Sequence, residues 1–416
     1  NLIDIIINDK TEKAGILTTS ATGSITATTV SIDKSKMQRT LEAEGKNTKV
    51  IIPVDTASDK VTAQLNGETF SSIYEKQCTI ELKTNYASYI LPVNLMNIAG
   101  LSGQLGSGIN MKDITINITI SKSGSEIRNL VASAAQNQDF TVVTSPIEFT
   151  VTCSYEGKSI EISEFSGYCE MTIKLPEGVY PNNITTAIAI DPDGTVRHVP
   201  TQVIISDRSF HVKISSIAGK SYSIINKPVK FKDIEAHWAK EAVNDMGSRM
   251  IISGIGDNVF EPDRDITRGE FAAIIVRALG LKVSEGASPF SDVKETDWYC
   301  QYVKTASEYG LISGYEDGKF RANDKITREQ AMAIIARAMK LTGLDSGFTS
   351  SDEEALLSVY KDSKDLSSYA RNAAATCINN GIVSGRSADT LVPKGNITRA
   401  ETAVIIRNLL KTSGLI

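Results

Sequence analysis

Arginine occurs at the same position in three similar segments of the chain, residues 265–281, 325–341 and 396–412. In each segment it follows Ile-Thr and precedes apolar residues with helical spacing. The positive end of the helix dipole disfavours a cation at the start of a helix, so its threefold recurrence suggests a function. Free helix-start amides and a guanidinium together predict a site for a carboxylate or a phosphate. The arginines are Arg268, Arg328 and Arg399.

These arginines have an alternative, structural interpretation. An acid follows the aromatic residue that opens each repeat, and salt bridges between repeats would join it to the arginine. The three acids, which are also candidate ligand-binding residues, are Asp233, Asp292 and Asp362. In the ligand-binding interpretation we expect an exposed arginine, whose replacement by alanine changes stability by less than about 0.5 kcal/mol.

Aromatic residues and glycines accompany each arginine. The aromatic residues lie in the first helix of each repeat, where they could present flat faces to sugar rings or simply pack between repeats. A Ser-Gly pair closes the same helical segment, and we expect its glycine to supply a permissive backbone. These further candidate ligand-binding residues are Trp238, Trp298, Tyr369, Gly254, Gly314 and Gly385.

Residues for enzyme chemistry are few. The five cysteines form no C-x-x-C motif and none is close to a histidine in sequence, which argues against zinc and thioredoxin-type sites. Cys153 and Cys169 could bridge in a hairpin, or all five could be buried free thiols. None of the three histidines lies in a nucleophile elbow. We therefore expect no catalytic residues, no metal and no cofactor.

Composition limits the classes of partner. The formal net charge of −5 disfavours nucleic acid. No apolar run approaches the roughly 20 residues that span a bilayer, so we expect no membrane partner. The sequence begins without Met or a leader, which we interpret as a mature or excised fragment.

The C-terminal part repeats one pattern three times, at residues 231–282, 290–343 and 360–412. Each repeat has an aromatic-x-Asp opening, a short helix, Ile/Val-Ser-Gly, a turn and the Ile-Thr-Arg helix. A capping box is predicted at each second helix, with Thr at the cap and Glu or Gln three residues later. Two short helices cannot bury both their faces alone, so the repeats must pack together. Extra residues before the third repeat form a polar insert.

The first 226 residues have a different character. Segments 113–123, 147–155 and 209–217 alternate apolar with polar residues, which predicts half-buried strands, and a hairpin turn is predicted at 191–194. Helical patches interrupt the strands at residues 35–43, 94–105 and 125–136. We predict a β-rich module with inserted helices at 1–143 and a β-sandwich-like module at 144–226.

Residues 231–416 resemble three tandem S-layer homology repeats, the module that anchors bacterial surface proteins to the cell wall. The first repeat carries the resemblance in Phe231-x-Asp233, His237-Trp238-Ala239, Ile252-Ser253-Gly254, Phe260-x-Pro262 and Ile266-Thr267-Arg268-x-Glu270. It implies an all-α, pseudo-threefold bundle. It also implies grooves between repeats that bind a peptidoglycan-linked secondary cell-wall polysaccharide through a pyruvate ketal, with the motif arginine meeting the ketal carboxylate. Residues 1–226 more weakly resemble the β-rich segments that precede such repeats in clostridial and bacillary surface proteins.

Two functional hypotheses share this anchor. The first is a non-catalytic extracellular S-layer-type protein, with residues 1–226 as a spacer. The second is an exported enzyme, such as a glycan hydrolase, with its catalytic domain upstream. A cytosolic α-solenoid is disfavoured by the capping-box arginines and the Thr-rich strands. The third repeat departs from the pattern at Tyr369 and Arg386, and the first at residues 255–258, so we expect unequal grooves, with the second most intact.

Overall fold

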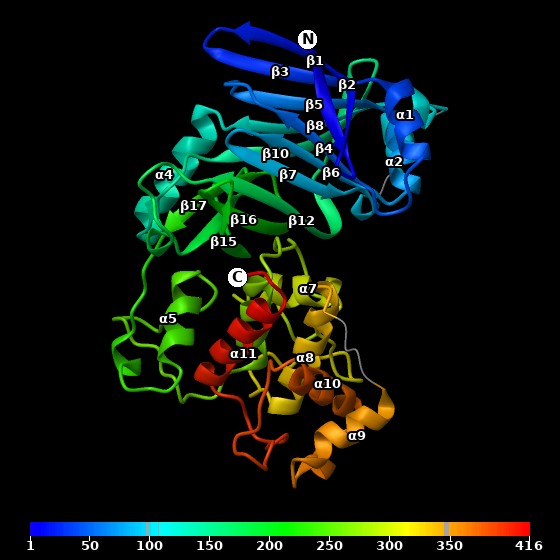
Figure 1. Ribbon diagram of the computed structural model, residues 1–416. Coiled ribbons are helices and arrows are strands. Elements are labelled where there is room, and N and C mark those ends of the chain that lie inside the picture. The colour runs from blue at the N-terminus through cyan, green and yellow to red at the C-terminus, as the bar shows by residue number, and fades with distance from the viewer. Residues whose placement is uncertain (97–99, 107, 345–348) are drawn as a thin grey trace. The chain divides into compact units, whose positions relative to one another are not determined.

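The computed structural model describes residues 1–96, 100–106, 108–344 and 349–416. The chain divides into two compact units, residues 1–196 with 201–226 and residues 197–200 with 227–416. The first is rich in strands and the second is helical (Figure 1). This confirms the predicted order of a β-rich part followed by a helical part.

Strands of the first unit are mostly five to ten residues long, and β2 is the longest. They are β1 (Leu2–Ile7), β2 (Lys10–Thr22), β3 (Ile25–Ile32), β4 (Lys49–Val54), β5 (Lys60–Asn66), β6 (Thr79–Thr84), β7 (Ala87–Pro92), β8 (Thr115–Lys122), β9 (Thr141–Val142), β10 (Ile147–Tyr155), β11 (Lys158–Ile162), β12 (Glu164–Lys174), β13 (Thr186–Ile190), β15 (Thr201–Ser206), β16 (Ser209–Ala218) and β17 (Ser221–Asn226). Strand β14 (Val196–Val199) falls at the division between the units.

The pairings join these strands into one continuous sheet. Its order is β15, β16, β12, β7, β6, β4, β1, β2, β3, β5, β8, β10, β17 and β13. Only β3–β5 and β4–β6 are parallel among the described pairs. Strands β8 and β10 pair along their length across residue 143. The predicted division at this residue stays a prediction.

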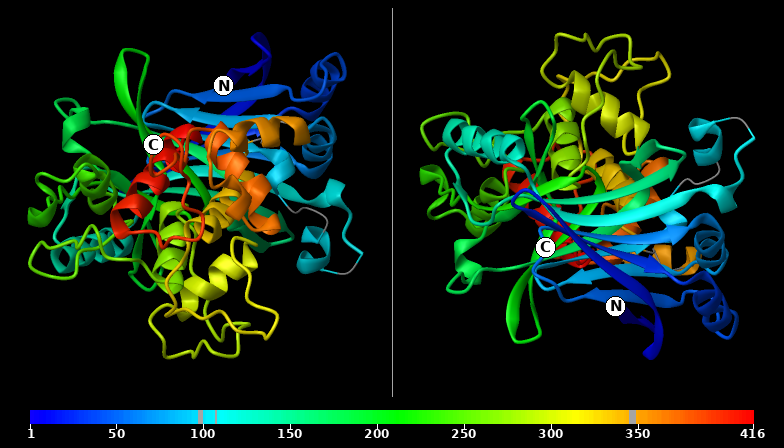
Figure 2. Two further views of the ribbon diagram at one scale, coloured as in Figure 1. Left: turned by 90° about the horizontal axis from the view of Figure 1, so that it is seen from below. Right: turned by 90° about the horizontal axis from the view of Figure 1, so that it is seen from above.

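Alternating burial builds the core of this unit. In β8 the side chains of Ile116, Ile118 and Ile120 are fully buried, as the alternation of apolar residues predicts. Helices α1 (Lys34–Glu42) and α2 (Gly67–Glu75) pack against each other, and α1 also packs on β2 (Figures 1 and 2). Helix α4 (Ser125–Gln138) lies where the sequence predicts it.

One predicted helix of this unit differs. The described residues of 94–105 include the end of a 3₁₀ turn (Val93–Leu95) and a short helix, α3 (Leu101–Leu105). The predicted helix also includes residues 97–99, which lie outside the described residues. The predicted turn at 191–194 is present, because the Gly194 amide donates to the Asp191 carbonyl over 2.9 Å.

The second unit contains two α-helices from each repeat. They are α5 (Lys240–Ser248) and α6 (Arg268–Ala278), α7 (Cys300–Glu308) and α8 (Arg328–Leu341), and α10 (Ser368–Asn379) and α11 (Arg399–Thr412). The described part of the polar insert forms one more helix, α9 (Ser350–Ser358). Short 3₁₀ turns open the first and third repeats at Lys232–Ile234 and Ser363–Asp365.

The first helix of each repeat packs on the second helix of another. Helix α7 packs on α6, α10 on α8, and α5 on α11. Single β-bridges between the motif segments follow the same ring, Asp265 with Thr398, Thr267 with Lys325 and Thr327 with Asn396. Each repeat therefore contacts both others, and the side chains that start one second helix meet the loops of another repeat.

Candidate functional site

The Ile-Thr-Arg motif begins each second helix with a capping box. The hydroxyls of Thr267, Thr327 and Thr398 accept from the third helical amide, and Glu270, Gln330 and Glu401 accept from the threonine amide. This confirms the prediction. The next two amides are not free, however. Those of Arg268 and Gly269 donate to the carbonyls of Asp324 and Ala322 in the second repeat, and the other two helices repeat this arrangement.

The prediction that free helix-start amides help to bind an anion is therefore wrong. Arg328 and Glu329 donate to the carbonyls of Gly395 and Pro393, over 2.9 and 3.0 Å. The backbone amides of Arg399 and Ala400 donate to the carbonyls of Arg264 and Pro262, over 2.9 Å each. These backbone amides therefore bind the loop of a neighbouring repeat and are not available to an anion. The guanidinium groups remain as the cationic part of the site.

The motif arginines are buried, which corrects the prediction that they are exposed. Arg268, Arg328 and Arg399 are 7%, 4% and 8% exposed. Each Nε donates to a carbonyl of another repeat, and each Nη2 donates to the carbonyl of the Ser-Gly serine there. The Nε acceptors are Phe320, Leu391 and Phe260, and the Nη2 acceptors are Ser313, Ser384 and Ser253, in the order of the arginines.

Burial lowers the pKa of all three arginines. A guanidinium nevertheless stays protonated in proteins, so three positive charges are held in the interior. The two donor directions used at each arginine join one repeat to the loop of the next. Each arginine therefore stabilises the contact between two repeats, in addition to any role in binding a ligand.

The three acids do not pair with these arginines within the described residues, so the salt-bridge interpretation is wrong. Asp233 accepts from the amides of Phe260 and Glu261, over 2.9 and 2.7 Å. Asp292 accepts from Phe320 and Arg321, and Asp362 from Leu391 and Val392. Burial raises the pKa of Asp233, but the donating amides outweigh it and leave the pKa below its ordinary value.

In each repeat, the aspartate and the arginine of another repeat form hydrogen bonds to the same loop residue. Asp233 accepts from the Phe260 amide while the Arg399 Nε donates to the Phe260 carbonyl. Phe320 is held in the same way by Asp292 and Arg268, and Leu391 by Asp362 and Arg328. The acids therefore position the loop, and the arginine reaches that loop from another repeat.

The Ser-Gly glycines are required for space rather than for a left-handed backbone. None of the three has a positive φ angle. A Cβ at Gly254 would lie 2.6 Å from the Val259 carbonyl oxygen, and one at Gly314 would lie 2.8 Å from that of Lys319. At Gly385 the Thr390 oxygen would be 2.6 Å away. The predicted reason for these glycines is corrected to close approach of the loop.

The three aromatic residues are exposed. Trp238, Trp298 and Tyr369 keep 67%, 58% and 57% of their surface. Burial between repeats therefore does not account for them. Flat apolar faces held in solvent can stack on other molecules, which leaves the sugar-stacking interpretation as a proposal.

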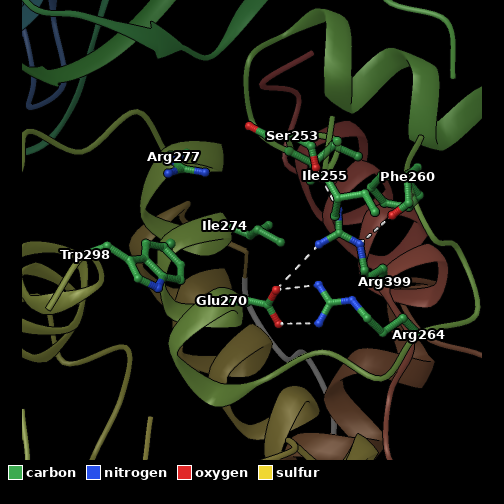
Figure 3. Close-up of a pocket in the computed structure, with 12 residues that line it drawn as sticks. Ser253, Ile255, Phe260, Arg264, Glu270, Ile274, Arg277, Trp298 and Arg399 are labelled. Atoms are coloured by element: carbon green, nitrogen blue, oxygen red, sulfur yellow. Dashed lines mark hydrogen bonds and ion pairs between the residues drawn. The ribbon is translucent and has the colours of Figure 1, made fainter. Parts of the chain in front are cut away.

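The surroundings of Arg399 form a cavity of about 250 Å³ (Figure 3). Arg399 comes from the third repeat, Trp298 from the second, and the remaining lining from the first. Glu270 lies 3.7 Å from Arg399 and forms a 2.6 Å ion pair with Arg264. In Figure 3, Trp298 and Arg277 lie on the other side of Glu270 from Arg399. The lining residues are Ile252, Ser253, Gly254, Ile255, Phe260, Arg264, Glu270, Ala273, Ile274, Arg277, Trp298 and Arg399.

The Arg268 and Arg328 sites differ from this one. Arg268 lies 4.9 Å from the Tyr315 ring centroid and 4.6 Å from that of Phe320. Arg328 instead pairs with Glu401 over 3.0 Å, and Arg386 forms two hydrogen bonds of 2.8 Å with the same carboxylate.

Sequence reasoning missed Glu329 and the second arginine of helices α6 and α8. Glu329 is buried and accepts from the Tyr369 hydroxyl over 3.1 Å and from Lys394 over 2.6 Å. The residues that correspond to Glu329 in the other repeats are Gly269 and Ala400. The third repeat has Tyr369 where the other two have Trp, and Glu329 accepts a hydrogen bond from the hydroxyl of that tyrosine. Arg277 and Arg337, each nine residues after the motif arginine, were visible as a repeated cation.

Other kinds of site are not found in the described part of the chain. It has no cluster of His, Cys, Asp and Glu residues that could hold a metal ion. All five cysteines are buried free thiols, so Cys153 and Cys169 do not form a bridge. None of the described helices has the length and apolar character needed to span a membrane.

Residues 230–272, 289–332 and 359–403 each match the S-layer homology domain. The C-terminal part of this chain carries three S-layer homology domains in tandem. Such domains anchor proteins at the bacterial surface. Their matched ranges contain the acid, aromatic residue, glycine and arginine of each repeat described above.

Relatives of the chain include enzymes and surface proteins. The amylopullulanase of Thermoanaerobacterium thermosulfurigenes is 29% identical over 93% of this chain and 19% of its own length. Exoglucanase XynX of Acetivibrio thermocellus is 38% identical over 47% of this chain and 18% of its own length. The surface-layer 125 kDa protein of Lysinibacillus sphaericus is 30% identical over 42% of this chain and 14% of its own length.

This chain spans less than a fifth of the length of each of these relatives. The S-layer homology domains and the surface-protein relatives indicate an extracellular location, at the cell wall or in an S-layer. The helical part is accordingly a cell-surface anchor.

Proposed function

We propose that this chain anchors a bacterial surface protein non-covalently to the cell wall by binding a pyruvylated secondary cell-wall polysaccharide between its S-layer homology repeats. The proposed ligand-binding residues are Arg268, Arg328, Arg399, Trp238, Trp298, Tyr369, Asp233, Asp292, Asp362, Gly254, Gly314 and Gly385. The aspartates and glycines act by shaping the loops that the arginines reach.

The observation that carries this proposal is the cavity at Arg399. A buried guanidinium, two further arginines and an exposed tryptophan meet there around a single carboxylate, Glu270. An anionic sugar needs a cation for its acidic group and a flat apolar face for its ring, and this cavity offers both. The ring of contacts among the repeats also supports a pseudo-threefold bundle, which would present three such sites.

The experiment is sedimentation of the chain with purified cell walls. Walls that retain their secondary polymer should carry the protein into the pellet. Walls from which the polymer has been stripped should leave it in the supernatant. Equal sedimentation with both preparations would assign binding to peptidoglycan and would contradict the polysaccharide proposal.

A second candidate is the anchor and spacer portion of an exported glycan hydrolase whose catalytic domain lies upstream. The observation in its favour is the amylopullulanase match, which extends over 93% of this chain and so includes the β-rich part. Both candidates use the same anchor, and in both we propose that residues 1–226 are non-catalytic.

Hydrolysis assays on wall glycans and on starch test the non-catalytic part of this proposal. The chain alone should release no reducing sugar above a heat-denatured control. Release that disappears when one carboxylate is changed to its amide would make residues 1–226 catalytic.

A further inference from the structure

The three motif arginines differ in the partner of one guanidinium nitrogen, Nη1. All three use Nε and Nη2 in the same way, to hold the loop of another repeat. Nη1 of Arg328 donates to Glu401 over 3.0 Å, and Nη1 of Arg399 lies 3.7 Å from Glu270. For Nη1 of Arg268, no acceptor is found within the described residues. Arg268 is therefore the arginine with an open N–H edge.

The cause is a single residue in the capping box. Glu270 and Glu401 close their boxes and also face the arginine of another repeat. Their counterpart in the second repeat is Gln330, which is neutral. Its Oε1 accepts from the Thr327 amide over 3.1 Å, and its Nε2 donates to the Tyr315 hydroxyl over 3.3 Å. Nε2 is a donor and offers no acceptor to Arg268, and within the described residues no hydrogen bond joins Arg268 to Oε1.

The local charge follows the same pattern. At the Arg328 site, Glu401 is shared by Arg328 and Arg386. At the Arg399 site, Glu270 is shared by Arg399 and Arg264. Burial lowers the pKa of Arg268 more than the charge of Asp324 raises it, and among the described residues no carboxylate forms an ion pair with Arg268. A buried cation without a paired acid attracts an anion strongly, because the low-dielectric surroundings screen its charge poorly.

The Arg268 site also has its aromatic neighbours in place. Tyr315 stacks beside both Arg268 and Arg321, whose centres lie 4.9 and 4.1 Å from its ring. Tyr369 is exposed, and Glu329 holds its hydroxyl over 3.1 Å. A sugar whose carboxylate meets the Arg268 edge would therefore find the Tyr315 ring nearby.

We propose that the Arg268 site is the principal carboxylate-binding site of this chain, and that Gln330 is the residue that leaves it open. The Nη1 edge of Arg268 takes the carboxylate of an acidic sugar. Glu401 accepts from Nη1 of Arg328, and Glu270 lies 3.7 Å from Nη1 of Arg399, so these carboxylates compete with a ligand at the other two arginines and weaken binding there. The inference rests on the proposed function and adds which of the three sites carries most of the affinity.

Isothermal titration of the full chain with purified pyruvylated wall polysaccharide tests this inference. The decisive variant is Gln330→Glu, because Glu closes the same capping box in the first and third repeats. The variant should therefore fold normally, with an unchanged or higher Tm, while its carboxylate occupies the Arg268 edge. We expect affinity to fall about tenfold or more, since a charge-assisted contact is lost.

Two further variants complete the experiment. Glu401→Gln should raise the number of binding sites per chain, because it frees the edge of Arg328. Lys83→Ala is the matched surface control and should bind as the unmodified chain does, since its partner Asp207 belongs, like Lys83, to the β-rich unit. Unchanged affinity in Gln330→Glu, or lost binding in Glu401→Gln, would overturn the inference while leaving the proposed function intact. Failure of the unmodified chain to bind would overturn both.

Discussion

At the scale of single residues, each motif arginine both holds a neighbouring repeat and carries a buried charge. Arg328 donates to two backbone carbonyls and to Glu401, and none of these acceptors belongs to its own repeat. A buried acceptor that loses its donor costs about 1–3 kcal/mol. Binding and folding are therefore coupled at this residue, so a loss of binding in an arginine variant has to be compared with its stability.

Replacing Arg328 by alanine should lower the free energy of unfolding of the helical part by about 3 kcal/mol or more, since one buried and two partly buried acceptors each lose a donor. Urea titration followed by circular dichroism measures the change. Arg328→Lys should be intermediate, because an ammonium keeps the charge without the planar fork. A midpoint that matches the unmodified chain would show that the contacts of Arg328 contribute nothing to stability.

Acid should weaken the same contacts through Glu401. Burial raises the pKa of Glu401, but Arg386, the Thr398 amide and Arg328 outweigh it and hold the pKa below its ordinary value of 4.5. A carboxyl group with a depressed folded pKa stabilises the protein above pH 4.5, and that contribution is lost as the pH falls through the folded pKa.

The Tm should therefore fall on acidification, and fall less in Glu401→Gln than in the unmodified chain. Thermal melts at a series of pH values from about 7 to about 3 measure this difference. Two parallel curves would mean that Glu401 titrates alike in the folded and unfolded states.

At the scale of elements, the loop between the two helices of each repeat is the part on which the site depends. Asp292 accepts from the Phe320 amide, Arg268 donates to the Phe320 carbonyl, and Gly314 lets the loop approach Phe290 and Lys319. The helix caps fix where the arginine begins, and the loop fixes what it reaches. Both are needed to bring the arginine of one repeat to the loop of another.

Gly314→Ala should destabilise the helical part by about 1–3 kcal/mol, because a Cβ would lie 2.5 Å from Phe290 Cε1 and 2.8 Å from the Lys319 oxygen. Gly269→Ala is the matched control. Its Cβ would come no closer than 3.2 Å to Ala322, and the third repeat already has Ala400 at this position. Equal losses of Tm in the two variants would contradict the close-approach explanation.

At the scale of the whole molecule, a helical anchor follows a β-rich unit. Three repeats contact one another in a ring, so each site takes residues from more than one repeat, as the cavity at Arg399 does from all three. A deletion of one repeat should therefore remove parts of the remaining sites. The β-rich unit has its own buried core and a continuous sheet, which suits a spacer that folds independently of the anchor.

The sequence predicted what short-range chemistry determines. The capping boxes at Thr267, Thr327 and Thr398, and strands such as β10, depend on residues a few positions apart. Burial of Arg399 could not be predicted, because its acceptors Ser253 and Phe260 lie more than a hundred residues earlier. The sheet order was likewise out of reach, since the β7–β12 pairing joins distant segments and leaves no local pattern.

The most direct test of the anchor is binding to the wall polysaccharide before and after mild acid removes its pyruvate ketals. The sugar backbone stays the same and only the carboxylate is lost. We predict that the chain binds the native polymer and loses at least about 90% of that binding with the depyruvylated polymer, because the guanidinium of Arg268, which has no ion-pair partner among the described residues, then remains without an anion. Equal affinity for the two polymers would contradict the account, since the arginines would then have no part in recognising the wall.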